Sequence, residues 1–308
     1  MPLAGFECPS TGDTIDIEAA SEYFEDNGIV PAEVIDAIVL ADIKSSTLRS
    51  GTHLSPSIAD PESTCRREVV IKRFLPYFPL PYQSWLADEG TAIHAYLQQA
   101  GATIANNKSK FEVRLPTEEH RNLVDVTRTE DGVLEVSILP KIPMSGQIDR
   151  VTQLSNGNVD ITDYKTKGYP WTYKKDADPV DYSSGEAKKA QIQLNFYRFM
   201  YEKLFGVKVE NLWIWKIYKG SRKRNKTFTK IPVPMMTLHD LAIKASPHLL
   251  SLGEMLLNAE SLTDKPEKLE KYIASLPMDG EKMFNGQKCP LYCDGYKICF
   301  GLSGKAVF

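Results

Sequence analysis

The stretch that most constrains the fold is GQIDRVTQLSNGNVDITDYKTK, residues 146–167. Two runs of alternating apolar residues flank a polar segment that contains Asn156 and Gly157. Asn-Gly between alternating runs is a strong hairpin signal, because a type I′ turn needs positive φ at both central positions. The sequence therefore predicts two antiparallel strands joined by a type I′ turn.

This predicted hairpin carries two acids and a lysine. Asp163 and Lys165 are two residues apart, so their side chains leave the same face of the strand, whereas Tyr164 points the other way. Asp149 lies on the first strand. Two carboxylates and one ammonium on a hairpin face are the groups that a metal-dependent phosphodiesterase needs. A divalent cation activates the attacking water and offsets the developing negative charge.

Each of these groups has an expected role in such chemistry. Hard cations such as Mg²⁺ or Mn²⁺ prefer oxygen ligands, so Asp149 and Asp163 are candidate ligands, and the carbonyl of Tyr164 adds a third oxygen. Lys165 is expected to position the attacking water or to stabilise charge at phosphorus. His94 lies in a predicted helix, where a lone histidine most often has a packing role, but imidazole suits Mn²⁺ well.

Other segments predict an α/β chain. Helices are expected over 84–100, ended by Gly101, over 186–205, capped by Gly206, and over most of 237–276, where Pro247 marks a kink or boundary. Strands are expected over 109–116, 133–140, 211–220 and 227–234. The first 50 residues are expected to hold one or two short helices, with Pro31 at a helix start, and residues 52–80 a turn and then a helix.

Composition narrows the class of protein. The chain has 308 residues, 42% hydrophobic and 25% charged, which is typical of a globular protein. No apolar run approaches the roughly 20 residues of a membrane span, and no secretory signal opens the sequence. We therefore expect a cytoplasmic protein, of a cell or a host, with no membrane partner. The net charge of −3 gives no global positive field, so nucleic-acid binding must depend on local patches.

The cysteines predict a metal or cluster site. There are five in a chain without an export signal, so a disulfide framework is not expected. Cys289, Cys293 and Cys299 lie within eleven residues of one another. Cys65 lies near the start of a predicted helix, and Cys8 is interpreted as a thiol without a role.

In their order along the chain, these motifs resemble the PD-(D/E)xK nuclease superfamily. The resemblance covers about residues 60–300 and includes Asp149 in GQID and Asp163-Tyr164-Lys165 in DITDYK. His94 in GTAIH and Gln193 and Tyr197 in QLNFY resemble additional motifs of its RecB-like branch. The resemblance implies a restriction-endonuclease-like core, a central mixed sheet flanked by helices.

The resemblance also implies site roles. His94, Asp149 and Asp163 correspond to metal ligands, and Lys165 corresponds to the catalytic lysine. The helix that carries Gln193 and Tyr197 is implied to lie beside the active site, near the DNA backbone.

One upstream cysteine and a C-terminal trio are the layout of iron–sulfur RecB-like nucleases, among them CRISPR-adaptation, AddB-type and phage enzymes. By this resemblance Cys65, Cys289, Cys293 and Cys299 ligate a [4Fe–4S] cluster that joins helical N- and C-terminal parts. Cys289 and Cys293 are separated by three residues, where the family commonly has two, which puts the local loop geometry in question. Zinc competes for four thiolates. A structural staple is the expected role, because closing a long loop restricts the unfolded chain, with electron transfer as the rival.

The resemblance divides the chain into an N-terminal extension of unknown role, residues 1–50, and an iron–sulfur nuclease domain, residues 51–308. Within that domain the catalytic core is expected over about 85–233, and the cluster-binding parts over about 60–80 and 285–302.

The sequence thus predicts a metal-dependent DNA exonuclease. A preference for single strands and 5′→3′ polarity follow from the resemblance, as does a role in recombination, repair, phage DNA processing or CRISPR adaptation, with partner proteins from those processes. A basic track and stacking aromatic residues are expected to hold the strand: Lys167, Lys174, Lys175, Arg222, Lys223, Arg224, Trp171 and Tyr173. Two alternatives are a non-catalytic iron–sulfur DNA-binding subunit of a recombination complex and a redox or zinc-binding regulator. The oligomeric state stays open.

Overall fold

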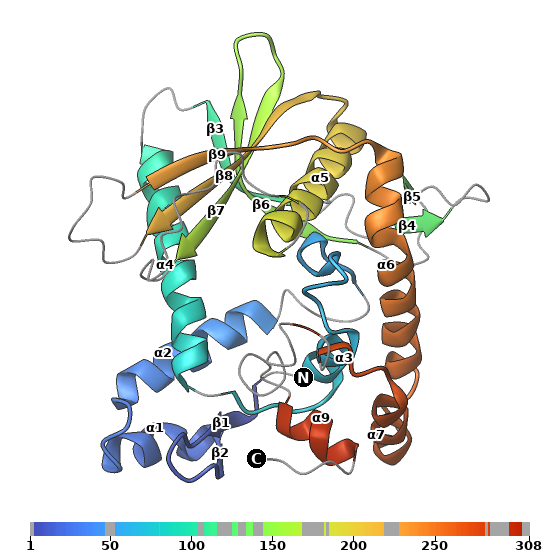
Figure 1. Ribbon diagram of the computed structural model, residues 1–308. Helices are drawn as coiled ribbons and strands as arrows, with labels where there is room; N and C mark the ends of the chain where they lie inside the picture. The colour runs from blue at the N-terminus through green and yellow to red at the C-terminus, as the bar shows by residue number, and fades with distance from the viewer. Residues whose placement is uncertain are drawn as a thin grey trace. The chain divides into compact units, whose positions relative to one another are not determined.

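The computed structural model describes residues 3–46, 53–79, 81–103, 108–115, 125–128, 134–137, 144–167, 182, 185–218, 228–280, 283 and 296–303. The chain forms two compact units. Unit 1 comprises Met1–Thr52, Thr64–Glu89 and Leu252–Phe308, and unit 2 comprises His53–Ser63 and Gly90–Ser251. Helices α4 (Pro81–Thr103) and α6 (Leu238–Glu260), labelled in Figure 1, have residues in both units.

Unit 2 is built on a five-stranded mixed sheet in the order β3-β6-β7-β8-β9. Only β7 and β8 run parallel; the other neighbouring pairs are antiparallel. The strands are β3 (Ser109–Leu115), β6 (Gly146–Gln153), β7 (Val159–Lys167), β8 (Val209–Tyr218) and β9 (Phe228–Val233). The prediction of a central mixed sheet flanked by helices is confirmed.

Helix α5 (Gly185–Phe205) connects β7 to β8, because parallel neighbours need a crossover connection. It lies against the sheet in Figure 1. Every residue from Ala190 to Tyr197 is buried, so the middle of the helix is packed on all sides. Gly206 follows the helix with φ +64°, which confirms the predicted C-cap.

The predicted hairpin of β6 and β7 is confirmed, but the predicted type I′ turn is wrong. Of the two residues of the Asn-Gly pair, only Gly157 has positive φ, at 85°. The Gly157 amide donates to the Leu154 carbonyl (3.1 Å), and the Leu154 amide donates to the Asn158 carbonyl (2.8 Å). These bonds define a three-residue loop whose last residue is left-handed, a geometry that requires a single glycine.

A second, separate sheet has two strands, β4 (Asp125–Arg128) and β5 (Leu134–Ser137), which pair antiparallel. The predicted strand over 133–140 corresponds to β5, and β4 was not predicted. The predicted strand over 109–116 is confirmed as β3.

The first residues of unit 1 form two short strands and two helices. The elements are β1 (Gly5–Glu7), β2 (Thr14–Asp16), α1 (Ile17–Asp26) and α2 (Ala32–Ser46). The two helices were predicted, and α2 begins directly after Pro31. The strands were not, because three residues show no readable alternation. They enclose a small core of Leu3, Phe6, Cys8, Ala20, Phe24, Ile35 and Ile38. The domain boundary at residue 50 stays a prediction.

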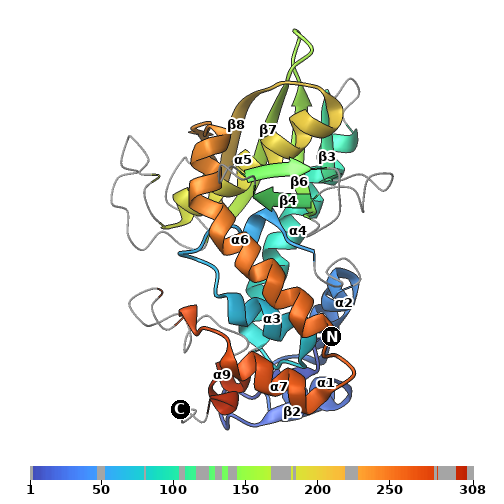
Figure 2. The same ribbon diagram turned by 90° about the vertical axis from the view of Figure 1, so that its right-hand side faces the viewer.

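The other part of unit 1 brings distant segments together. Helices α3 (Arg66–Phe74), α7 (Pro266–Ser275) and α9 (Tyr296–Leu302) pack on one another and lie side by side in Figures 1 and 2. Cys65 is the N-cap of α3, as expected of a residue at a helix start. Cys299 lies within α9.

The predicted helix end at Gly101 is wrong, and of the two expectations at Pro247, a kink or a boundary, the boundary is wrong. Helix α4 continues through Gly101 to Thr103, and α6 continues through Pro247 to Glu260. A glycine costs a helix only about 1 kcal/mol, which packing can outweigh. None of the helices that the structure describes has the length and apolar character of a membrane span.

Candidate active site

Asp149 lies where the two hairpin strands stop pairing. The ladder between β6 and β7 runs from Gln153↔Val159 to Arg150↔Thr162, so Asp149 and Asp163 would form the next pair. Instead, the backbone N–H of Tyr164 donates to Asp149 Oδ2 at 2.7 Å. The carboxylate of Asp149 therefore takes the place of a backbone acceptor and lies between the strands.

Asp163 and Lys165 form an ion pair on one face of β7, which confirms that they share this face. Lys165 Nζ lies 2.8 Å from Asp163 Oδ2. Burial raises the pKa of Asp163, and the charge of Lys165 only partly opposes that rise. Burial lowers the pKa of Lys165, but Asp163 and Asp149 outweigh it and leave this pKa above its ordinary value. The lysine therefore carries its proton at neutral pH.

His94 on α4 reaches the same carboxylate from the other side. Its Nδ1 lies 3.6 Å from Asp149 Oδ1, and its ring meets the ring of Tyr164 edge-on, with centroids 5.7 Å apart. Asp163 and Tyr164 are consecutive on β7, so their side chains leave opposite faces of the strand, as predicted. Burial lowers the pKa of His94, but the hydrogen bond and charge of Asp149 more than compensate, so this pKa is raised. The structure brings His94 and Asp149 together.

Gln193 and Tyr197 on α5 cover the face of the sheet that carries the acids. Gln193 Nε2 donates to the Tyr197 hydroxyl at 3.5 Å, and both side chains are buried, which confirms that they share a helix face. Burial raises the pKa of Tyr197 to about 12, and the nearby charges of Asp163 and Asp149 add to this rise. Tyr197 is therefore a neutral hydroxyl next to the acids.

Gly146, the glycine of GQID, leaves space for Tyr197, a role that the sequence did not reveal. A Cβ at Gly146 would lie 2.6 Å from Tyr197 Cε1 and 3.0 Å from Pro56 Cδ. Since the first distance is far shorter than van der Waals contact, only glycine fits at this point without moving the ring. The position of Tyr197 thus depends on a residue three positions before Asp149.

The opposite side of α5 is fixed by polar contacts that were also not predicted. Asn195 Nδ2 donates to the carbonyls of Gln191 and Pro234 at 2.9 and 3.1 Å, and its Oδ1 accepts from Met236 N at 2.8 Å. Arg198 Nη2 donates to the Met236 carbonyl at 2.8 Å. Polar residues at three-residue spacing in a helix with apolar neighbours were the available signal. These bonds hold α5 against the segment after β9.

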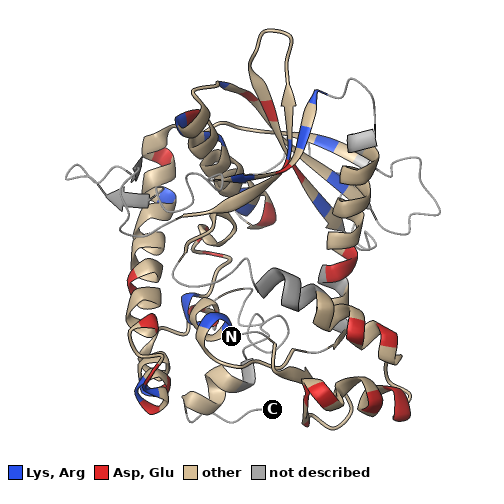
Figure 3. Ribbon diagram, turned by 180° about the vertical axis from the view of Figure 1, so that it is seen from behind, with Lys and Arg blue, Asp and Glu red and all other residues tan. Residues whose placement is uncertain are grey.

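Lys216 is a second lysine on the face of Lys165. The two residues are partners in the parallel register of β7 and β8, so their side chains leave the same face. Blue Lys and Arg positions are visible on the strands of the sheet in Figure 3. The alternation Leu212, Ile214, Lys216 could have indicated this face, but not the register that places Lys216 beside Lys165.

The site has the donor set of a divalent cation without forming a ready-made cage. Within the described ranges, no three His, Cys, Asp or Glu side chains converge as a metal site. The acids instead hold protein partners, Lys165 and the Tyr164 amide. Asp163 Oδ2 is buried and accepts no well-directed hydrogen bond from a described residue, which leaves an oxygen for a cation. The residues present at this site therefore fit Mg²⁺ or Mn²⁺.

The carbonyl of Tyr164 is oriented toward this site. In an extended strand the N–H and C=O of one residue point to the same side. Because the N–H of Tyr164 faces Asp149, its carbonyl faces the same gap between β6 and β7. This orientation fits the predicted third oxygen ligand.

Of the remaining predicted residues, the structure describes only Cys65, Cys299 and Lys167. Cys65 and Cys299 are buried in unit 1. Lys167 ends β7. The other predicted residues lie outside those that the structure describes: Cys289, Cys293, Trp171, Tyr173, Lys174, Lys175, Arg222, Lys223 and Arg224.

A family model described as the PD-(D/E)XK nuclease superfamily matches residues 63–299. No curated protein matches. Twelve chains of solved structures match. One is the crystal structure of SSO0001, with a TM-score of 0.47 and 13% identity, covering 89% of this chain and 98% of that chain. The family match spans most of the chain and includes His94, both acids, Lys165 and the α5 pair. The chain therefore belongs to the PD-(D/E)XK nuclease superfamily, and this membership suggests a metal-dependent nuclease.

Proposed function

We propose that this protein is a metal-dependent DNA exonuclease that prefers single strands and degrades them 5′→3′. The observation that carries the proposal is the ion pair of buried Asp163 with Lys165 beside Asp149, where the β6–β7 ladder ends. A buried carboxylate with a raised pKa and a charged partner is typical of a functional site. Substrate, strand preference and polarity come from the RecB-like resemblance of the motifs.

The metal ligands that we propose are Asp149, Asp163, the Tyr164 carbonyl and His94. When bound, Mg²⁺ or Mn²⁺ supplies a water of lowered pKa and offsets charge on the phosphate. At Asp163 a cation would take the place of the ammonium of Lys165, which now lies 2.8 Å from the buried Oδ2. Metal binding at Asp163 would release Lys165 toward the substrate.

Lys165 acts in this proposal as a cation and hydrogen-bond donor. Its raised pKa keeps the ammonium protonated, so it is suited to orient the attacking water and to stabilise negative charge at phosphorus. It is not suited to remove a proton. Tyr197, whose pKa of about 12 keeps it neutral, and Gln193 are suited to hydrogen-bond the phosphate backbone without adding charge.

The strand would follow the basic and aromatic residues already predicted, from Lys167 at the end of β7 onward. Lys216, beside Lys165, adds a phosphate contact close to the acids. Base stacking on aromatic residues is tolerant of sequence, which suits a processive or general exonuclease. Recombination, repair, phage DNA processing and CRISPR adaptation all use such activity and would supply the protein partners.

A [4Fe–4S] cluster on Cys65, Cys289, Cys293 and Cys299 completes the proposal. Support comes from unit 1, where α3, which Cys65 caps, packs against α9, which contains Cys299. Two of the four proposed ligands thus come from segments that are far apart in sequence and adjacent in the fold. Both thiols are buried, as cluster ligands usually are. We assign the cluster a structural role, and zinc is the competing metal.

The proposal is tested with single-stranded DNA labelled at either the 5′ or the 3′ end, with matched duplexes, and Mn²⁺ or Mg²⁺. Wild-type protein should release short products from the 5′ end of single strands, and chelator should stop it. Asp163→Asn and Lys165→Ala should be inactive. Asp160→Asn is the matched control, since Asp160 lies on the same strand but bonds Asn211 and Trp213 on the opposite face.

Other outcomes separate the alternatives. A wild-type protein that binds single strands but leaves them intact under every metal condition contradicts catalysis and favours a DNA-binding subunit. Endonucleolytic or 3′-end products contradict the proposed polarity only. Iron and sulfide analysis decides between the cluster and zinc.

A further inference from the structure

Helix α4 approaches strand β7 closely at Gly90, a residue that is not among the proposed metal ligands. A Cβ added at Gly90 would lie 3.1 Å from Thr166 Oγ1. This distance is shorter than ordinary van der Waals contact, so a methyl group at this point would displace its neighbour by a few tenths of an ångström. Thr166 is β-branched and has little freedom at χ1, so its side chain cannot easily turn away. The helix and the strand would have to move apart instead.

The same face of α4 carries His94. Gly90 and His94 are four residues apart and share a helix face, and Thr166 and Tyr164 are two apart and share a strand face. Gly90 lies against Thr166, and the His94 ring meets the Tyr164 ring edge-on, with centroids 5.7 Å apart. Four helical residues rise about 6 Å and two strand residues about 6.6 Å, so the two contacts match in spacing. Helix α4 thus runs along the end of β7, in the opposite direction (Figure 1).

The Tyr164 ring is a fixed surface for His94. Its side chain is buried, and burial raises the pKa of Tyr164, a rise that the hydrogen bond of Arg150 only partly opposes. Arg150 is held in turn, because its Nε donates to Ser109 Oγ at 2.9 Å. The position of His94 therefore depends on how closely α4 approaches the strand.

This position decides whether the imidazole can serve the metal site. His94 Nδ1 lies 3.6 Å from Asp149 Oδ1. A ligand must be held within about 0.5 Å of its productive geometry. A shift of a few tenths of an ångström at Gly90, one helical turn away, is large on that scale. Since imidazole suits Mn²⁺ better than Mg²⁺, such a shift would affect Mn²⁺ most.

We propose that Gly90 is a positioning residue for His94. By lacking a side chain it lets α4 approach β7 closely enough for the imidazole to act as the nitrogen ligand that favours Mn²⁺ over Mg²⁺. The inference rests on the metal site of the proposed function. Alanine in a helix interior is about 1 kcal/mol more favourable than glycine, so Gly90→Ala is expected to keep the helix while it displaces the histidine.

The test measures metal binding without DNA. Full-length proteins are titrated with Mn²⁺, followed by the room-temperature electron paramagnetic resonance signal of the free ion, and Mg²⁺ is measured by competition. Gly90→Ala should weaken Mn²⁺ binding about tenfold, the lower end of the usual effect of losing a group that supports a metal ligand. Mg²⁺ binding should change less. Gly90→Ala/His94→Ala should bind Mn²⁺ like His94→Ala, because Gly90 acts only through the imidazole.

Substitution of Thr166 separates the close approach from other effects. Gly90→Ala/Thr166→Ala removes the hydroxyl group that the new Cβ meets and should recover most of the tenfold loss, whereas Gly90→Ala/Thr166→Val keeps a group there and should not. Thr166→Leu fills the same gap from the strand and keeps Gly90, so it tests the contact even if Gly90→Ala does not fold. Gly301→Ala is the matched control, because a Cβ on that helical glycine meets nothing within 4 Å, and it should bind Mn²⁺ like wild type. Circular dichroism checks that helix content is retained.

The inference is wrong if Gly90→Ala binds Mn²⁺ like wild type while His94→Ala binds it more weakly. It is also wrong if the glycine substitution weakens binding equally with and without His94, because Gly90 would then support the fold alone, or if Thr166→Ala restores nothing. These results leave the metal site of the proposed function intact. A wild-type protein that binds no Mn²⁺, or a His94→Ala protein that binds it like wild type, contradicts that metal site and this inference with it.

Discussion

At the scale of single residues, the two acids have different partners. Asp149 accepts a backbone hydrogen bond and lies near His94, whereas Asp163 is buried against a lysine. Removal of a neighbour therefore has different consequences for each. The ammonium of Lys165 is the partner that matters most to Asp163, because no well-directed hydrogen bond from a described residue reaches the carboxylate oxygen beside it.

Lys165→Met is expected to abolish activity and also to lower stability in the absence of metal. The change leaves the carboxylate of Asp163 buried without its cation, at a cost of about 1–3 kcal/mol. The cost stays below that of a fully buried pair because the Lys165 side chain is 38% exposed. Urea denaturation in chelator measures it, and added Mn²⁺ should restore part of the loss.

The double variant Asp163→Asn/Lys165→Met is the control, since it removes both charges. It should be inactive but closer to wild type in its free energy of unfolding than Lys165→Met. Equal losses in the single and double variants would show that the ion pair does not set the stability of this site.

Gly146→Ala is expected to lower both stability and activity. The added methyl group meets the ring of Tyr197 at 2.6 Å, and overpacking of this kind typically costs about 1–3 kcal/mol. Thermal unfolding and nuclease assays measure the two effects. Gly301→Ala is the control, since a Cβ there meets nothing within 4 Å, and alanine favours its helix. A Gly146→Ala protein as stable and active as wild type would contradict the close approach of Tyr197.

The sequence predicted the residues whose relation is local. Asp163 and Lys165 alternate on one strand, and Gln193 and Tyr197 are one helical turn apart, so periodicity alone gave their common faces. Gly146 was not recognised, because its contact is with a helix much further along the chain.

At the scale of elements, α5 determines where Tyr197 lies. One side of the helix meets the acids, and the other is fixed to the segment after β9 by Asn195 and Arg198. A polar side chain that satisfies three backbone groups in a buried place is costly to remove. The position of the active-site face thus depends on contacts on the far side of the same helix.

Asn195→Ala is expected to lower the free energy of unfolding by about 1–3 kcal/mol, because Met236 N loses its acceptor in a buried place. Activity should fall with it, as α5 loses part of its anchorage. Chemical denaturation and steady-state kinetics measure both. Asn211→Ala serves as comparison, since Asn211 is exposed and bonds the side chain of Asp160, so its loss should cost little. An unchanged Asn195→Ala protein would contradict the anchoring role.

Lys216→Gln is expected to raise KM severalfold and to change kcat less than Lys165→Ala does. The parallel register places Lys216 beside Lys165, where it can contact phosphate without touching the reacting atoms. The matched control is Lys230→Gln, because Lys230 lies over the Trp213 ring, on the opposite face of the sheet. If Lys216→Gln lowers kcat and leaves KM unchanged, this lysine instead takes part in the chemical step.

The elements themselves were largely predictable, and their ends were not. Alternation and apolar periodicity gave the five strands of the sheet and α5, but α4 passes Gly101 and α6 passes Pro247. Packing outweighs local propensity at such positions. The Asn-Gly pair predicted a hairpin correctly and its turn type wrongly, since one left-handed glycine suffices for a three-residue loop.

At the scale of the whole molecule, the proposed cluster and the proposed nuclease site belong to different compact units. His94, Asp149, Asp163 and Tyr197 lie in unit 2, whereas Cys65 and Cys299 lie in unit 1. A cross-link between segments separated by more than 100 residues is worth up to roughly 5 kcal/mol in loop-closure entropy. If the cluster has a structural role, it stabilises most directly the helices that it joins.

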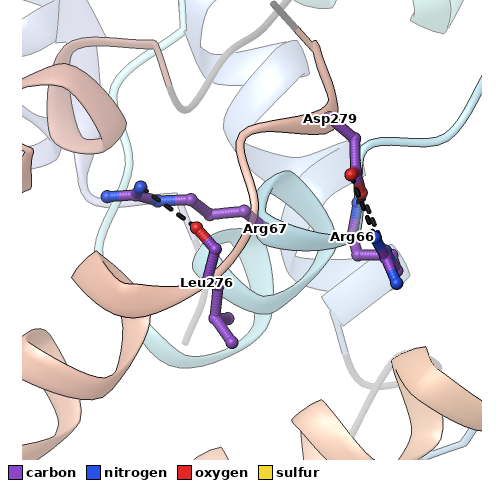
Figure 4. A network of polar contacts seen from close by, with 4 residues as sticks. All are labelled: Arg66, Arg67, Leu276 and Asp279. Atoms are coloured by element: carbon purple, nitrogen blue, oxygen red, sulfur yellow. Dashed lines mark hydrogen bonds and ion pairs between the residues drawn. The ribbon is translucent and has the colours of Figure 1, made fainter.

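Removal of the cluster is therefore expected to loosen unit 1 selectively, and hydrogen exchange measured by peptide can show this. In Cys65→Ser, amides of α3, α7 and α9 should exchange faster, while those of α5 and β7 stay protected. Cys8→Ser is the matched control, because Cys8 is also buried in unit 1 but is not a proposed ligand, so it should keep both iron and protection. Equal deprotection of α5 and β7 would mean that the cluster stabilises the nuclease sheet as well. If Cys65→Ser loses iron and hydrogen exchange is unchanged in all five elements, the staple role is wrong. The Arg66–Asp279 ion pair (Figure 4) and the packing of the helices would then be enough to hold these elements together.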